Sequence, residues 1–368
     1  MSDKIELGNA SDFHVHLRDG AMMELVAPTV REGGVSLAYI MPNLVPPITT
    51  IERVNEYKAA LQKAAPETTF WMTFYLSRDL TPELVEKAAK EKAIRGIKCY
   101  PAGVTTNSSA GVDPNDFSDF YPIFEVMEKY GLVLNLHGEK PSTKIANDTD
   151  NHDDSEDIHV LNAEPKFLPA LFKLHQDFPK LKIVLEHCTT KAAIEAIDEI
   201  NASRNPQDPI TVAASITAHH LYLTIDSWAG NPINFCKPVA KLPSDKRALV
   251  DAAVSGKPYF FFGSDSAPHP LSGKARHVGV CAGVYTQSHS LSYLAEVFDQ
   301  KNALDKLKGF VSDFGNAFYG VKKEDLKSQQ QVVLVKKETT VPELIGEGEL
   351  VVAPFMPGEK LSWGFEWV

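Results

Sequence analysis

Short apolar runs alternate with longer segments of helical periodicity along most of this 368-residue chain. Compact apolar runs bounded by turn-forming residues are typical of strands buried on both faces. They predict strands at 12–17, 36–41, 70–76, 94–100, 132–137, 182–187, 211–217 and 259–264. Between most of these runs, apolar residues recur every three or four positions and indicate helices. The predicted helices span 51–65, 82–92, 116–130, 164–177, 191–200 and 245–253.

Eight strands that alternate with helices over about 250 residues have the scale of a (β/α)8 barrel. An open doubly wound sheet is the alternative, but it usually carries a glycine-rich turn after its first strand. Here that position holds His14-Val15-His16 instead. We therefore predict the α/β class and a (β/α)8 TIM barrel, formed by residues 1–328.

Three segments depart from the regular alternation. The stretch 101–113 is rich in glycine and hydroxyl side chains and predicts a mobile loop. The stretch 147–157 is strongly acidic, and we favour a solvated surface loop there over a calcium site. The tail from Gln329 holds short β-like runs at 332–335 and 349–353. We expect this extension, residues 329–368, to pack on the outside of the barrel and to belong to the same domain.

Composition and charge narrow the class of protein. Hydrophobic residues make up 43% and charged residues 23% of the chain, as in a soluble protein with a well-buried core. A formal net charge of −11 argues against binding to nucleic acid or to an anionic membrane, although a small anionic substrate needs only a few local cations. The four cysteines form no C-x-x-C pair, and the N-terminus has no apolar signal region. We expect a protein of the reducing cytoplasm.

The candidate chemistry lies at the ends of the predicted strands. His14 and His16 are two positions apart on a strand, so they point to one face, with Phe13 and Val15 on the other. The ends of other predicted strands carry Lys98, His137, His187 and Asp265. Taken one at a time, each residue could have a purely structural role: His137 and His187 as core histidines, Lys98 as a lysine at the rim, and Asp265 as a helix cap. Because the catalytic face of such a barrel is formed by the C-terminal ends of its strands, we expect them to converge.

Four histidines and a carboxylate are too many ligands for one open zinc site. They suit two metal ions about 3.5–4 Å apart. Such a pair needs an anionic bridge, and Lys98 is the strand-end residue left to supply one. An ammonium group would be repelled by two dications, whereas a neutral lysine can react with carbon dioxide and become a bridging carbamate.

Eight motifs, in this order along the chain, carry a family resemblance. They read D-F-H-V-H-L-R-D, M-P-N-L, G-I-K-C-Y-P-A, T-T-N-S-S, L-H-G-E, E-H-C-T-T, T-A-H-H-L and G-S-D-S-A-P-H. Through about Tyr319 the chain resembles the amidohydrolase superfamily, and more closely the dihydroorotases of the single-function, bacterial-type branch. Position 237 departs from the pattern, because it holds lysine where relatives often carry an apolar residue. The acidic insertion also looks longer than in bacterial relatives.

The resemblance implies two zinc ions in each subunit. One would be held by His14, His16, Lys98 and Asp265, and the other by His137, His187 and the carbamylated Lys98 (N6-carboxylysine). It further implies that the substrate carboxylate is bound by Arg18, Asn43 and His269, where an arginine can make a bidentate contact. Main-chain groups near Lys237 and Ala282 would bind the pyrimidine edge, and Thr105 and Thr106 would close over the substrate as a lid.

The implied reaction is the reversible cyclisation of N-carbamoyl-L-aspartate to L-dihydroorotate with loss of water, a step of de novo pyrimidine biosynthesis. A hydroxide between the metals would attack in the hydrolytic direction, with Asp265 as general acid and base. The resemblance also implies a homodimer. Two alternatives stay open. One is another cyclic-amide hydrolase, a hydantoinase or allantoinase. The other is a catalytically inactive scaffold, which would be expected to have lost a metal ligand.

Overall fold

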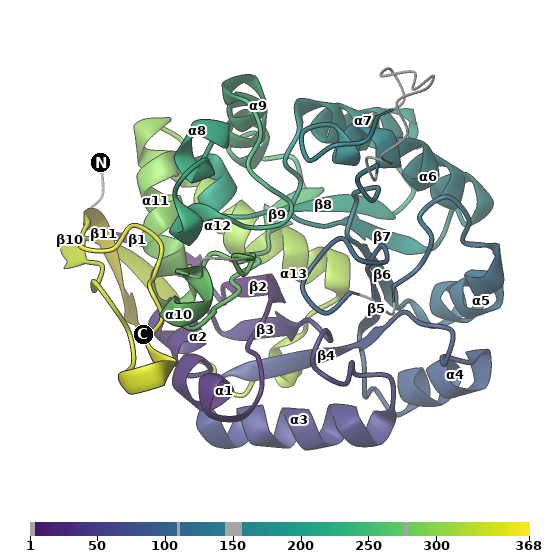
Figure 1. Cartoon of the computed structure of the whole chain (residues 1–368), viewed down its shortest axis with the longest axis horizontal. Coiled ribbons are helices and arrows are strands. Elements are labelled where there is room, and N and C mark those ends of the chain that lie inside the picture. The colour runs from purple at the N-terminus through teal and green to yellow at the C-terminus, as the bar shows by residue number, and fades with distance from the viewer. Residues whose placement is uncertain (1–3, 109–110, 144–156, 276–278) are drawn as a thin grey trace.

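The barrel is a parallel sheet of eight strands in sequential order, shown in the computed structural model of the chain (Figure 1). The structure describes residues 4–108, 111–143, 157–275 and 279–368. Every barrel strand overlaps the range predicted for it. The strands are β2 (Ser11–Val15), β3 (Leu37–Ile40), β4 (Thr69–Tyr75), β5 (Gly96–Cys99), β6 (Val133–Leu136), β7 (Lys182–Leu185), β8 (Val212–Ile216) and β9 (Phe260–Phe262).

The sheet closes on itself where the segment after β9 meets β2. Val15 and Ser266 form an isolated parallel bridge. The backbone N–H of His16 donates to the carbonyl of Ser266 at 3.0 Å, and that of Asp265 donates to the carbonyl of His14 at 2.8 Å. The predicted (β/α)8 barrel is confirmed, and its seam joins two of the candidate metal-binding segments.

Helices surround the barrel on its outside (Figure 1). They are α1 (Gly20–Val26), α2 (Thr29–Glu32), α3 (Ile51–Ala64), α4 (Pro82–Lys90), α5 (Tyr121–Tyr130), α6 (Ala163–Asp177), α7 (Lys191–Ser203), α8 (Ile225–Trp228), α9 (Pro243–Ala253), α10 (Leu271–Lys274), α11 (Ser290–Gln300), α12 (Leu304–Lys308) and α13 (Phe314–Tyr319). The six predicted helices are all present. Thr50, Thr81 and Thr190 cap three of them, each side chain accepting a hydrogen bond from a backbone N–H of the first turn.

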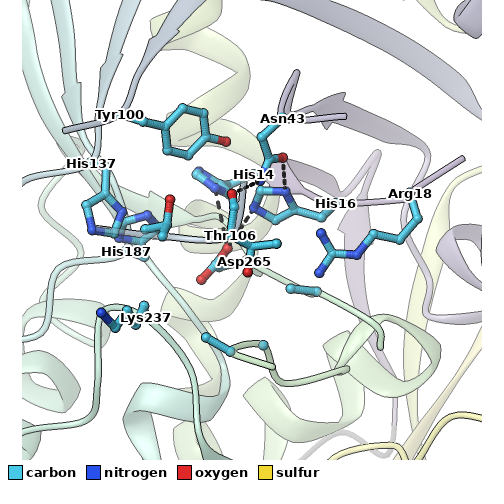
Figure 2. Close-up of a pocket in the computed structure, with 14 residues that line it drawn as sticks. His14, His16, Arg18, Asn43, Tyr100, Thr106, His137, His187, Lys237 and Asp265 are labelled. Carbon is cyan, nitrogen blue, oxygen red and sulfur yellow. Dashed lines mark hydrogen bonds and ion pairs between the residues drawn. The ribbon is translucent and has the colours of Figure 1, made fainter. Parts of the chain in front are cut away.

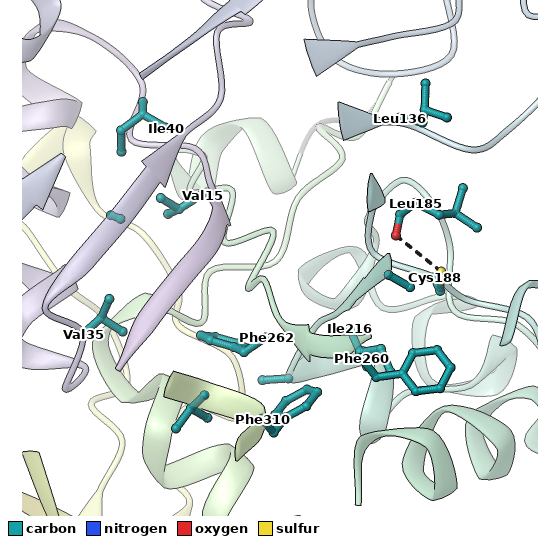
Figure 3. Packing of buried hydrophobic residues seen from close by; sticks show 14 of the residues in the cluster. Val15, Val35, Ile40, Leu136, Leu185, Cys188, Ile216, Phe260, Phe262 and Phe310 are labelled. Atoms are coloured by element: carbon teal, nitrogen blue, oxygen red, sulfur yellow. Dashed lines mark hydrogen bonds between the residues drawn. The ribbon is translucent and has the colours of Figure 1, made fainter. Parts of the chain in front are cut away.

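Two hydrophobic layers fill the barrel and its surroundings. The outer layer lies between strands and helices and includes Val15, Ile40 and Phe262 (Figure 3). Inside the barrel, Phe13 stacks on Tyr319 of α13 with ring centroids 4.3 Å apart. Our prediction that Phe13 and Val15 share a face is therefore wrong. The strand register shifts between Asp12 and Val15, and such a bulge breaks the alternation of side chains.

Outside the barrel, the two ends of the chain form a three-stranded antiparallel sheet. It has the order β1 (Lys4–Gly8), β10 (Val332–Thr340), β11 (Lys360–Trp367). The predicted run at 332–335 is confirmed as part of β10. The predicted run at 349–353 is wrong, because it contains a 3₁₀ turn at Gly348–Leu350 and only a single bridge between Val352 and Ile345. Pro354, which has no N–H, follows directly.

The remaining predicted segments have different outcomes. Most of the acidic stretch 147–157 lies outside the described residues. In the described part of 101–113, Val104 and Val112 are buried, and the Ser108 hydroxyl accepts from Thr105 N at 2.9 Å. This loop thus has apolar anchors that we did not expect. Among the described residues, no helix is long and apolar enough to cross a membrane.

Candidate active site

One mouth of the barrel gathers the predicted metal-binding side chains, and all six are buried. Figure 2 shows five of them, and the sixth is Lys98. His14 lies on β2 with His16 just beyond it, Lys98 lies on β5, and His137, His187 and Asp265 follow β6, β7 and β9. The ring of His187 lies 4.9 Å from that of His14 and 4.8 Å from that of His137, between centroids. One ligand atom each from His14, His187 and Asp265 lie within 4.8 Å of one another. The convergence expected from the strand ends is therefore observed.

Asp265 lies between the two histidines of β2 and the open pocket. Its Oδ1 is 3.1 Å from Nε2 of His16 and 3.5 Å from Nε2 of His14. Burial alone would raise the pKa of this carboxyl group. The hydrogen bond from His16 and the charge of His14 outweigh burial and lower the pKa below its ordinary value. Asp265 is therefore ionised at neutral pH and available to accept a proton.

Lys98 and Glu186 are completely buried beside one another at the base of the site. Burial lowers the pKa of the Lys98 amine, which favours its neutral form, although the charge of Glu186 opposes this effect. Among the described residues, Lys98 Nζ has no hydrogen-bond partner. It lies 4.7 Å from the ring centroid of Tyr100, another pocket residue. Burial thus increases the share of neutral amine, which is the form that can react with carbon dioxide.

Glu186 is a site residue that our sequence reasoning missed. Its Oε2 lies 2.9 Å from Nδ1 of His14, and its Oε1 accepts a hydrogen bond from Asn135 at 2.6 Å. A carboxylate on the far nitrogen of a metal-binding histidine fixes the orientation of the ring. The signal was present in the E-H-C-T-T motif, in which this glutamate directly precedes His187.

A second carboxylate that we missed, Glu139, supports His137 in the same way. Glu139 Oε2 lies 2.9 Å from His137 Nε2, and its Oε1 accepts from the buried ammonium group of Lys241 at 3.1 Å. Burial would raise the pKa of Glu139, but Lys241 and His137 lower it to about 2. The bond to Nε2 leaves Nδ1 of His137 to face the site. The L-H-G-E motif contained this residue.

Arg18 and His269, predicted to bind a carboxylate, are in contact at the rim of the site. Arg18 Nη2 lies 2.9 Å from His269 Nε2, and Arg18 Nε donates to the carbonyl of Pro268 at 2.8 Å. Burial and the charge of Arg18 lower the pKa of His269 to about 3, so its ring is neutral. The same Nε2 is 2.9 Å from the carbonyl oxygen of Ala282. When Nε2 carries the proton it donates to Ala282, and Arg18 is free to bind an anion.

Asn43 joins His16, a predicted metal ligand, to the loop over the pocket. Its Oδ1 lies 2.7 Å from Nδ1 of His16, which leaves Nε2 of that ring for Asp265 and the site. Its Nδ2 donates to the carbonyl of Thr106 at 3.2 Å. The Asn107 side chain donates to the carbonyl of Asn43 at 3.0 Å. The loop therefore lies across the pocket and is fastened to the end of β3.

The pocket formed by these groups has a volume of about 370 Å³, part of which is open to solvent. Its lining includes the predicted substrate-binding residues Arg18, Asn43, Thr105, Thr106, Lys237 and Ala282. His269 contacts the pocket through Arg18, and Lys98 lies beneath it. In Figure 2, Arg18 and Lys237 lie at opposite edges, with Asp265 between them. The sequence-predicted site is thus assembled in one place.

Three residues of the site have a left-handed backbone although none is glycine. The φ angles are 61° for Arg18, 40° for His187 and 46° for Asp265. Such conformations cost free energy and persist where the surrounding structure imposes them, often at functional sites. Here they turn each side chain toward the pocket at the point where its strand ends.

Comparison with known proteins gives consistent matches. The sequence profile described as amidohydrolase matches residues 12–201. The chain is 63% identical to the dihydroorotase of Saccharomyces cerevisiae, over 100% of this chain and 99% of that protein. It is 48% identical to a probable dihydroorotase of Schizosaccharomyces pombe, over 99% of both. The crystal structure of the S. cerevisiae dihydroorotase in complex with 5-fluoroorotic acid superposes with a TM-score of 0.95 at 62% identity, covering 99% of this chain and 98% of that one.

Proposed function

Since this chain belongs to the dihydroorotases of the amidohydrolase family, we propose that its barrel mouth cyclises N-carbamoyl-L-aspartate reversibly to L-dihydroorotate with loss of water. The observation that carries the proposal is the placement of Asp265, ionised and within 3.5 Å of two histidines, between a metal-binding set and an arginine-lined pocket. In this assignment the enzyme serves de novo pyrimidine biosynthesis.

The donor set fits a pair of zinc ions. In the described part of the chain, His137 Nδ1 and Lys98 Nζ are buried polar atoms without a hydrogen-bond partner. Such atoms are costly unless an ion or water satisfies them. His14, His16, Asp265 and carbamylated Lys98 would hold one ion, and His137, His187 and the same carbamate the other. Bound there, the metals would lower the pKa of a water molecule and polarise the ring carbonyl.

Asp265 would move the proton. In the hydrolytic direction its carboxylate takes a proton from the attacking water and delivers it to the departing ring nitrogen. In the synthetic direction it takes a proton from the ureido nitrogen of N-carbamoyl-L-aspartate as the C–N bond forms, and returns that proton to the carboxyl oxygen that departs. The hydrogen bond from His16 holds the carboxylate in place for both transfers.

Arg18, Asn43 and His269 would bind the α-carboxylate and so hold the reacting carbonyl against the metals. Orientation of this kind can supply several kcal/mol of the barrier reduction. The backbone at Lys237 and Ala282 would bind the pyrimidine edge, while Thr105 and Thr106 would cover it. A plain hydantoin has no free carboxylate for Arg18, which favours the proposed substrate over that of a hydantoinase or allantoinase. All six metal-binding side chains are in place, which argues against an inactive scaffold.

The test is the variant Asp265→Asn, assayed by dihydroorotate absorbance in both directions together with metal analysis. Asparagine tolerates a left-handed backbone well, so the φ of 46° at this position should survive. We expect the metal content to be retained and turnover to fall by about 10²–10⁴-fold, the usual range for loss of a general acid–base group. Asp251→Asn, at an exposed ion pair with Lys301, is the matched control and should be fully active. Near wild-type turnover in Asp265→Asn would refute the acid–base assignment.

Three wider assignments complete the proposal. The family resemblance supports a homodimer, which sedimentation of the full chain would test. The four cysteines are all free thiols, in keeping with a reducing cytoplasm. Residues 1–328 and 329–368 form one domain in our proposal. In support, Leu334, Leu361 and Trp363 of the extension belong to the same buried cluster as the barrel residues.

A further inference from the structure

A second group of metal-binding side chains lies beside the active site and has no part in the proposed reaction. His219 and His220 follow β8 in a short 3₁₀ turn, His219–Leu221, and Cys236 precedes the pocket residue Lys237. The three side chains are at most 1% exposed. One ligand atom from each lies within 4.8 Å of the other two.

We propose that His219, His220 and Cys236 form a further metal site, specific for a borderline divalent ion such as Zn²⁺. Two imidazoles and a thiolate are ligands that zinc and its neighbours in the d-block prefer, whereas Mg²⁺ and Ca²⁺ require oxygen. A fourth ligand would come from water, as in other sites with three protein ligands.

The spacing of His220 and Cys236 matches a tetrahedral ion. Cys236 Sγ lies 3.6 Å from His220 Nε2. Zinc bonds of about 2.3 Å to sulfur and 2.0 Å to nitrogen place two tetrahedral ligands about 3.5 Å apart. His220 Nδ1 lies 2.8 Å from the Thr217 hydroxyl, which can accept a hydrogen bond from Nδ1 and so orient the ring. Binding would replace the present contact of Nε2 with the carbonyl of Pro238 at 3.1 Å.

His219 gives the second, independent reason. In the described structure neither of its ring nitrogens has a hydrogen-bond partner, although the side chain is fully buried. An unsatisfied polar atom of this kind costs about 1–3 kcal/mol, so a partner is expected. Burial lowers the pKa of His219 well below its usual value, which keeps the ring neutral and able to bind metal. Burial raises the pKa of the Cys236 thiol to about 12, and this thiol donates to the carbonyl of Pro238 at 3.2 Å. A bound metal would therefore have to displace the thiol proton, and the resulting thiolate would offset one positive charge of the dication.

The test is cobalt titration of the full-length enzyme loaded with two equivalents of zinc per chain, the number that the proposed catalytic sites hold. A thiolate bound to Co²⁺ gives an intense near-ultraviolet charge-transfer band. The proposed catalytic ligands include no sulfur, so the band would report only on a cysteine site. We expect one further equivalent of Co²⁺ with this band, and its loss when Zn²⁺ is added. Because the readout is not activity, failure of the proposed reaction would leave it interpretable.

Three variants make the assignment specific. Cys236→Ser should lose both the charge-transfer band and the further equivalent of Co²⁺. His219→Gln should lose at least the further equivalent of Co²⁺ when the metal concentration is limiting. Cys281→Ser, which changes the half-buried cysteine next to the pocket residue Ala282, is the matched control and should keep both. A band that survives in Cys236→Ser would overturn the proposal. So would a wild-type enzyme that binds no metal beyond its catalytic ions, in which case water alone satisfies His219.

Discussion

At the scale of single residues, the site depends on carboxylates that do not face the substrate. Glu186 contacts His14 and Glu139 contacts His137, each on the nitrogen turned away from the site. Partners of this kind fix both the orientation and the proton position of a metal-binding imidazole. The orientation of the predicted metal ligands at this barrel mouth therefore depends on buried carboxylates that contact them from behind.

Glu186→Gln removes the charge that faces His14 while keeping the shape of the side chain. We expect the affinity for catalytic metal to fall by about 10–100-fold, the usual effect of losing such a partner. Metal retained against a chelator measures this. Glu164→Gln is the control, because Glu164 is equally buried but accepts hydrogen bonds from Thr189 and Thr190 rather than contacting a ligand side chain. Equal metal loss in both variants would contradict the role given to Glu186.

Arg18→Ala separates substrate binding from metal binding. A charge-assisted hydrogen bond to the carboxylate contributes about 1.5–3 kcal/mol, so we expect KM for dihydroorotate to rise by about 10–150-fold. Metal content should stay unchanged, since Arg18 contacts Pro268 and His269 rather than a ligand. Steady-state kinetics and metal analysis on one preparation check both quantities. Parallel losses of metal and substrate affinity would instead point to a structural role.

At the scale of elements, the outer sheet stabilises the barrel without contributing to the pocket. β11 packs on α11, and Trp363 of β11 donates from Nε1 to Asp299 of α11 at 2.9 Å. Trp363 is 2% exposed and belongs to the main buried cluster. No residue of β1, β10 or β11 is among those that line the active-site pocket.

Trp363→Ala should lower the free energy of unfolding by about 3–5 kcal/mol, the usual cost of emptying a large aromatic site. KM should not change. Trp367→Ala is the control on the same strand, since Trp367 is only partly buried beneath the guanidinium group of Arg31. We expect a smaller loss there, with about 0.5–1 kcal/mol from the cation–π contact. Urea denaturation of the metal-loaded enzymes measures both, and equal losses would contradict the packing role of Trp363.

At the scale of the whole molecule, the buried histidines make stability depend on pH. Burial lowers the pKa of a group comprising His14, His16, His137, His187, His219, His220 and His269. Unfolding exposes each ring, which then binds a proton when the pH falls below the ordinary histidine pKa of 6.5. The unfolded state thus takes up more protons, and stability is lost as the pH falls below about 6.5.

We expect the urea midpoint of the metal-free enzyme to fall steeply between pH 7 and pH 5. Each neutral histidine contributes up to about 1.4 kcal/mol per pH unit, a limit that is approached as the pH falls below 6.5. Burial raises the pKa of Asp12, Glu164 and Glu186, which has the opposite effect, but these groups are fewer. Denaturation curves at half-unit intervals of pH would show the slope. A midpoint that rises on acidification would mean that the carboxyl groups dominate.

The sequence was most informative where the signal is local. Each barrel strand is a short apolar run with its own boundaries, and each candidate ligand lies at the end of such a run. Pairing between distant segments was harder to predict. β1 was missed although it pairs with β10, and β11 was missed despite the alternation of Leu361, Trp363 and Phe365. Glu139 and Glu186 were missed because a carboxylate beside a ligand can face either layer until the packing is known.

The seam of the barrel has a consequence for how the enzyme is made. His16 and Asp265 touch across 249 positions of sequence, so the ribosome must complete most of the chain before the two can meet. No nascent fragment that stops short of β9 can contain the complete set of proposed metal ligands, because Asp265 follows that strand. Metal binding at this site would then require that β9 and the segment after it have been synthesised and that the barrel has closed.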